Sequence, residues 1–125
     1  MKAILSRSFS NEVLKSFSAE DGVFVDCDFS GAVMEGARFT SAIFVGCRFV
    51  GTNLYCCSAF QMKAIRCVFE NVDFRGANLA STAFVQCEIK DCNFGPDNLG
   101  GTGLFDNIER TNCVINGDFP KAREV

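Results

Sequence analysis

The chain has 125 residues, 48% of them hydrophobic, and a net charge of −3. This length and composition fit one folded domain and argue against intrinsic disorder, which needs low hydrophobicity and high net charge. The acidic balance disfavours a general nucleic-acid binder, and the absence of histidine removes the commonest general base and a frequent metal ligand.

The N-terminal segment, residues 1–21, predicts a short cap. Its first ten residues hold no apolar run long enough for a signal peptide, so we expect a cytoplasmic protein. Ser10 suits the N-cap of a helix, and Val13, Leu14 and Phe17 would then share one face. We expect this short helix to cover the open end of the repeat that follows, because an uncovered end exposes unpaired backbone.

Every fifth residue from Phe24 to Leu104 is apolar, and the residues two positions before each of them are nearly all small. Asp97 is the one charged residue in these two series. A period of five matches neither an amphipathic helix nor an ordinary strand. It predicts a chain that turns the same way every five residues, so that four units close a square coil. Each unit then sends one large and one small side chain inward.

Several units have a shared form, among them Ala37-Arg38-Phe39-Thr40-Ser41 and Ala77-Asn78-Leu79-Ala80-Ser81. They resemble the pentapeptide-repeat family, whose units follow A-[DN]-[LF]-X-X with the third residue central. The resemblance covers about residues 22–104. It implies an all-β fold, a right-handed quadrilateral β-helix of about four to five coils stacked at about 4.8 Å. We assign residues 22–115 to this β-helix.

Turn-forming residues interrupt the repeat near its C-terminal end, in Gly95-Pro96-Asp97 and again in residues 100–103. Cys113-Val114-Ile115 then looks like a returning unit that is displaced by one residue. We therefore expect the register to slip between Gly95 and Cys113. Residues 116–125 are expected to form a polar tail.

Four cysteines lie 20 residues apart, at Cys27, Cys47, Cys67 and Cys87. In a coil of four units they form one column, which supports the predicted period. A straight column does not offer the tetrahedral, closely paired ligands of a zinc site. We expect no metal and no cofactor, and we interpret these residues as small buried filler with free thiols.

One face of the predicted prism is apolar on its outside. Its outward residues are Val23, Val25, Ile43, Val45, Ile65, Val85 and, by the same period, Phe105, with Lys63 as the interruption. An ordered apolar patch usually marks an interaction site. Two interpretations stay open. The face binds a protein, either an unidentified partner or a second copy in a homodimer, or a terminal segment folds over it.

The sequence carries no phosphate loop, nucleophile elbow or cleft of paired carboxylates, so we expect no enzymatic activity. We expect a non-enzymatic protein-interaction or structural module that binds neither nucleic acid directly nor a membrane. The alternative comes from the resemblance, because some pentapeptide-repeat proteins are DNA mimics that bind DNA gyrase or topoisomerase. Such mimics imply a strongly negative face, whereas Arg48 and Lys90 here share a face with Asp28 and Glu70. The resemblance also associates those mimics with a C-terminal helix that dimerises them and with a long projecting loop, and we expect neither in this chain.

Overall fold

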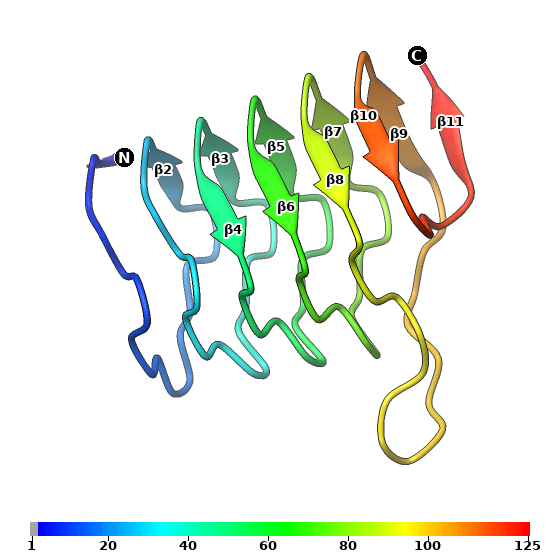
Figure 1. Ribbon diagram of the computed structural model, residues 1–125, viewed down its shortest axis with the longest axis horizontal. Coiled ribbons are helices and arrows are strands. Elements are labelled where there is room, and N and C mark those ends of the chain that lie inside the picture. Colours follow the sequence, from blue (N-terminus) through cyan, green and yellow to red (C-terminus); the bar gives the residue numbers. More distant parts are fainter. Residues whose placement is uncertain (1–2) are drawn as a thin grey trace.

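The computed structural model describes residues 3–125, and within that range it contains strands and no helix. The strands are β1 (Ile4–Leu5), β2 (Val23–Val25), β3 (Ile43–Val45), β4 (Arg48–Val50), β5 (Lys63–Ile65), β6 (Val68–Glu70), β7 (Ala83–Val85), β8 (Glu88–Lys90), β9 (Ile108–Thr111), β10 (Val114–Asn116) and β11 (Ala122–Glu124). They form a seven-stranded sheet in the order β1-β2-β3-β5-β7-β9-β11 and a four-stranded sheet in the order β10-β8-β6-β4. Every pair is parallel, and Figure 1 shows successive coils stacked along one axis. The protein is an all-β parallel β-helix.

Each coil has four faces. The seven-stranded sheet is the first face and the four-stranded sheet is the second. The third and fourth faces are joined by isolated parallel bridges, such as Val33 to Asn53 and Arg38 to Ser58. Bridge and strand partners lie 20 residues apart through these coils, which confirms the square coil that the five-residue period predicts.

The turn between faces depends on a left-handed residue two positions after each central residue. Gly36 (φ 68°) and Ser41 (φ 59°) are examples. At these corners the Ala37 amide donates to the Met34 carbonyl at 3.1 Å, and the Ala42 amide donates to the Phe39 carbonyl at 2.9 Å. A positive φ at the third turn residue with this bond is typical of a type II turn. A left-handed residue recurs every five residues from Ser6 to Asp91, and the chain therefore bends continually in one direction. The bond across the corner recurs on the third and fourth faces, for example from the Cys57 amide to the Leu54 carbonyl.

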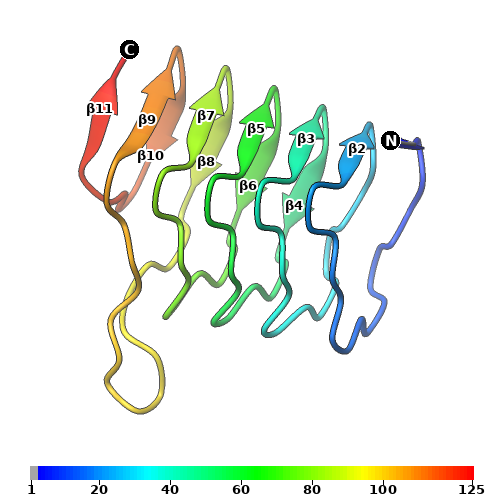
Figure 2. The ribbon, with the colours of Figure 1, turned by 180° about the vertical axis from the view of Figure 1, so that it is seen from behind.

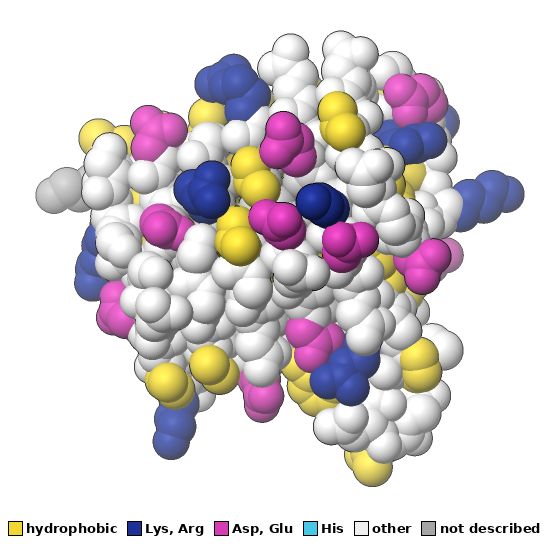
Figure 3. Space-filling model, viewed as in Figure 1, with side chains coloured by type: hydrophobic (Ala, Val, Ile, Leu, Met, Phe, Trp, Pro, Cys, Tyr) yellow, Lys and Arg dark blue, Asp and Glu magenta, His cyan; other side chains and the backbone are white. Residues whose placement is uncertain are grey.

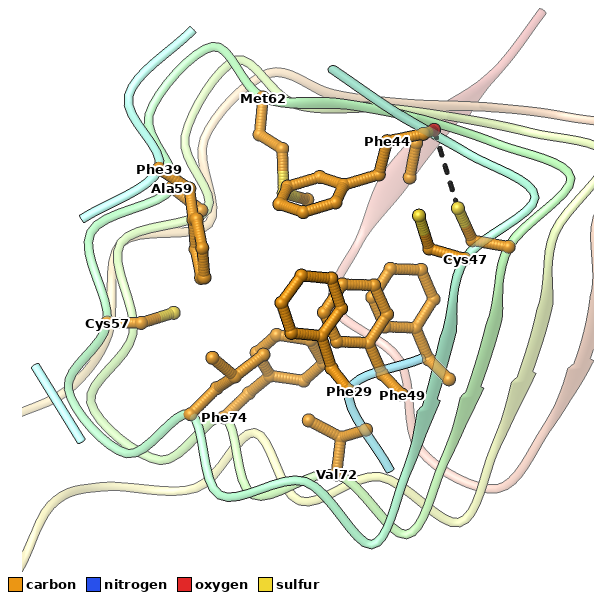
Figure 4. Close-up of a cluster of buried hydrophobic side chains, with 14 of the residues drawn as sticks. Phe29, Phe39, Phe44, Cys47, Phe49, Cys57, Ala59, Met62, Val72 and Phe74 are labelled. Atoms are coloured by element: carbon orange, nitrogen blue, oxygen red, sulfur yellow. Dashed lines mark hydrogen bonds between the residues drawn. The ribbon is translucent and has the colours of Figure 1, made fainter. Parts of the chain in front are cut away.

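The central residues fill the prism with stacked rings. Phe49 is 1% exposed, and its ring stacks on Phe29 at 5.0 Å and on Phe69 at 4.8 Å (Figure 4). The expected burial of Phe49 between these two rings is confirmed. A ring that is covered on all sides has no partner for a phenolic hydroxyl, which explains 14 phenylalanines against one tyrosine.

The small inward positions link each coil to the one before it. The thiol of Cys67 donates to the Phe44 carbonyl at 3.4 Å, and the hydroxyl of Thr52 donates to the Phe29 carbonyl at 2.8 Å. Both bonds join residues 23 apart in the chain. A small side chain with one hydrogen-bond donor therefore suits these positions. The cysteine column takes this role, and all eight cysteines are free.

The expected N-terminal capping helix is wrong, because residues 4–19 form a further coil of the β-helix. β1 pairs with β2, and the coil continues through bridges from Val13 to Val33 and from Ser18 to Arg38. Ser10 does not cap a helix, and its hydroxyl donates to the Ser30 carbonyl at 3.1 Å. The central series does extend back to Ile4, Phe9, Leu14 and Ala19. Arg7 and Glu12 occupy its small positions, and both are exposed, since residues 3–125 form no coil beyond them.

The register changes in the coil that begins with β7. β7 pairs with β9 through Ala83 and Glu109, which lie 26 residues apart instead of 20. The additional residues form the loop 95–103, which hangs below the prism in Figure 1. Pairing on the fourth face resumes with Leu104 opposite Asn78. Phe105 therefore points inward toward the core cluster, where its ring meets Phe94 at 6.1 Å.

The C-terminal residues cover one half of the end of the prism core. After β10 the chain does not continue onto the third face but crosses the end of the core and returns to the first face as β11 (Figure 1). Phe119 plugs this crossing, with its ring 5.8 Å from Phe84 and 5.5 Å from Phe94. The segment expected as a polar tail thus contributes a strand and a core ring.

Candidate interaction surfaces

The outer face of the seven-stranded sheet brings six of the seven expected interface residues together. Val25, Val45, Ile65 and Val85 occupy one column on successive strands, and Val23 and Ile43 lie beside them in the neighbouring column. All six are half-buried by their neighbours along the sheet. The parallel pairing explains this arrangement, because partners in register place equivalent side chains on the same side. We call these six residues the apolar strip.

Phe105 does not belong to the apolar strip, because the register change moves it to the fourth face and turns it inward. Leu5, which is not among the expected interface residues, extends the strip at its other end. Leu5 pairs with Val25 and is 64% exposed. The signal was present in the sequence, since the five-residue series reaches back to Ile4 and places Leu5 one position after it.

The apolar strip has defined borders. Lys63 interrupts the second column, and beyond β7 the outward positions become Glu109 and Thr111. β11 joins the edge of the sheet beside β9 and does not cross its outer surface. Figure 2 looks onto this sheet, and no other part of the chain from residue 3 onward lies over it.

The four-stranded sheet differs in charge from the apolar strip. Figure 3 shows blue and magenta side chains interspersed over this side of the molecule. Lys90 lies 3.8 Å from Glu70, and on the third face Arg75 lies 2.9 Å from Asp73. Arg38 and Glu20 form a further pair on the fourth face at 2.5 Å. One ion pair thus lies on each of these three faces.

The loop 95–103 is a projecting feature, which contradicts the expectation of no such loop. Its backbone is held against the prism, since the Asn98 amide donates to the Tyr55 hydroxyl at 2.7 Å and Arg75 donates to the Asn98 side chain at 3.2 Å. The Asp97 carboxylate accepts from two amides within the loop, those of Leu99 and Gly101, at 2.9 and 2.8 Å. The loop is therefore braced while Leu99 at its tip is 98% exposed.

Six of the eight thiols are buried in the core. Burial raises the pKa of Cys57 to about 12 and that of Cys92 to about 11, so both stay protonated at neutral pH. Cys56 is the exposed cysteine, at a corner between the third and fourth faces. Within residues 3–125 no three histidine, cysteine or carboxylate side chains converge as metal ligands. The same residues include no helix that is long and apolar enough to span a bilayer.

A four-sided parallel β-helix with a regular core and an ordered apolar outer strip defines this chain as a solenoid repeat protein. The family model for pentapeptide repeats matches eight copies, over residues 23–55 and 61–95, and the chain belongs to that family. Proteins of this kind are generally structural or interaction modules. No curated protein matches the chain by sequence.

The chain is also similar to solved structures. The chain is similar to QnrB1, described as a plasmid-mediated fluoroquinolone resistance protein, with a TM-score of 0.50 and 18% identity over 89% of this chain and 52% of that one. It is also similar to HetL, a pentapeptide-repeat protein involved in heterocyst differentiation regulation from the cyanobacterium Nostoc sp. strain PCC 7120. That match has a TM-score of 0.48 and 14% identity over 89% of this chain and 53% of HetL. The chain thus spans about half the length of each, and at 18% identity the likeness to QnrB1 shows the fold alone.

Proposed function

We propose that this protein is a non-enzymatic protein-interaction module that works through its apolar strip. One observation carries the proposal. Aliphatic side chains on successive strands form an ordered patch on the outer face of the sheet, and neither terminal segment covers it in the described chain. An ordered apolar patch usually marks an interaction site. The terminal-cover interpretation loses its support because β11 extends the sheet edge instead.

The occupant we propose is a second copy of this chain. The six residues lie on four strands, and four strands at about 4.8 Å spacing and about 10 Å of width give a strip of roughly 200 Å². A standard interface needs about 800 Å² from each partner, so surrounding residues must contribute the rest. A flat parallel-sheet face meets this need in a two-fold dimer, where the same patch on both subunits brings its own rim into contact.

Charging the centre of the apolar strip tests the proposal. Val45→Glu should convert a dimer to a monomer with little change in the fold, because Val45 points outward from β3. Val50→Glu is the matched control, since Val50 has the same burial and lies one face further along the same coil, on β4 of the four-stranded sheet. Sedimentation equilibrium should show the wild type and Val50→Glu as dimers. A monomeric wild type contradicts the proposed dimer, and a dimer that survives Val45→Glu places the contact elsewhere.

The second candidate is a DNA mimic that binds gyrase or topoisomerase. The similarity in fold to QnrB1 favours it, and so does the projecting loop. The lysine and arginine side chains interspersed among the carboxylates weigh against it, because a mimic of DNA needs a strongly negative face. A DNA gyrase supercoiling assay with the purified protein, with and without a quinolone, separates the two functions. A pure interaction module should leave supercoiling and quinolone inhibition unchanged.

A further inference from the structure

The C-terminal end of the β-helix lacks half a coil. Every earlier coil passes through all four faces, whereas after β10 the chain returns directly to the first face as β11 (Figure 1). The third and fourth faces of the last complete coil, at Phe94 and Phe105, therefore have no coil stacked beyond them. The crossing segment around Phe119 lies beside this gap and does not fill it.

Next to the missing half coil, backbone amides and carbonyls have no hydrogen-bond partner within residues 3–125. In the interior coils, the equivalent groups are paired. One coil earlier, the Phe74 amide donates to the Asn93 carbonyl at 2.8 Å and the Leu79 amide donates to the Leu104 carbonyl at 2.7 Å. The equivalent amides of the last coil belong to Phe94 and Phe105. Neither has a hydrogen-bond acceptor among residues 3–125.

Two carbonyl acceptors are left in the same way. In the coil before, the carbonyls of Val72 and Ala77 accept from the amides of Asn93 and Leu104, each at 3.0 Å. The equivalent carbonyls of Cys92 and Gly103 receive no such bond within the described chain. Two amide donors and two carbonyl acceptors thus point along the axis of the β-helix. Donors and acceptors alternate along the chain, as they do at the free edge of a β-strand.

A recess lies beside these groups. It has a volume of about 590 Å³, and its lining includes Phe94, Gly95, Phe105, Asp118, Phe119 and Pro120. The three phenylalanines are half-buried and offer ring surface that in every interior coil is covered by the next coil. Pockets of 300–1,000 Å³ with apolar walls and a few polar groups are the usual form of ligand sites.

We infer that this half-open end binds an extended segment of a partner protein, which adds to the prism as the missing third and fourth faces. Main-chain bonds to a free edge supply affinity in such strand addition, and side-chain pockets supply selectivity. The segment must carry two large apolar residues five positions apart, each preceded by a small residue two positions earlier. The carboxylate of Asp118 in the lining favours a segment without net negative charge. This inference does not depend on the apolar strip.

The chain itself supplies a probe. A fluorophore-labelled peptide with the sequence of residues 71–82 corresponds to the third and fourth faces of an interior coil. Its large apolar residues are Phe74 and Leu79. We expect saturable binding by fluorescence anisotropy. Amide hydrogen exchange should show new protection at Phe94 and Phe105 when the peptide is present.

A matched peptide distinguishes strand addition from simple hydrophobic contact. N-methylation at the positions of Asp73 and Asn78 removes the two amides that would donate to Cys92 and Gly103, while the side chains stay the same. Loss of two hydrogen bonds should weaken binding about tenfold or more. The Val45→Glu variant should bind the unmethylated peptide as well as the wild type does.

Three outcomes overturn the inference. The first is no saturable binding at millimolar peptide, and the second is equal binding of the methylated peptide. The third is protection of the Phe94 and Phe105 amides that rises with protein concentration before any peptide is added, since this assigns the end to a second copy of the chain. The protein is unaltered in these measurements, so loss of folding cannot imitate any of them.

Discussion

Truncating Phe49 to alanine tests the packing of the prism most directly. Its ring stacks on two others and meets Phe44 edge-on at 5.3 Å. The coils above and below are held at a set spacing by backbone bonds, such as the Phe29 amide to the Arg48 carbonyl at 2.8 Å, so the cavity cannot close. Phe→Ala substitutions in cores cost about 3–5 kcal/mol. We expect the upper half of this range, because aromatic pairs worth about 0.5–1.5 kcal/mol each are lost as well.

Urea unfolding followed by far-UV circular dichroism measures this cost. Phe60→Ala is the control, because Phe60 belongs to the same coil but is 38% exposed. We expect Phe60→Ala to lower the free energy of unfolding by less than about 1 kcal/mol, as exposed positions usually do. The m-values of both variants should match the wild type, which shows that the array still unfolds as one unit. If the two variants differ by less than about 1 kcal/mol, the ring stack does not stabilise the prism as described.

Three further outcomes follow from the contacts. Iodoacetamide should modify Cys56 in the native protein within minutes and Cys57 only on unfolding, because burial raises the pKa of the Cys57 thiol. Peptide mass mapping measures this, and early labelling of Cys57 would contradict its burial. Tyr55→Phe should speed exchange of the Asn98 amide, as seen by nuclear magnetic resonance, while the global free energy of unfolding stays nearly unchanged. Thr52→Val should cost about 0.5–1.5 kcal/mol in urea unfolding, since it removes a buried donor to the Phe29 carbonyl, which keeps its bond from the Ala32 amide.

The interior of this protein could be predicted from the sequence because its rule is local and repeated. Each five-residue unit places one large residue inward, one small residue two positions earlier, and a left-handed corner two positions later. Errors at single units are averaged out over many coils. Phe49 and the column of the apolar strip could therefore be placed without coordinates, and Leu5 follows from the same series.

The two ends could not be predicted in the same way, because inward positions there have a neighbouring coil on one side only. In the N-terminal coil, the open side accommodates Arg7 and Glu12 at positions that hold small residues in the other coils. These two charged residues break the five-residue pattern, so the sequence did not indicate a coil there. At the other end, Phe119 lies outside the periodic series and enters the core only because the chain crosses the prism.

The register change depended on pairing between distant residues. The sequence by itself indicated a displacement between Gly95 and Cys113, but not where pairing resumes. Leu104 lies on the fourth face because it bridges Asn78, and this contact turns Phe105 from an expected surface residue into an inward one. Local pattern determined which residues repeat, and hydrogen bonds between coils determined which face each residue joins once the period is broken.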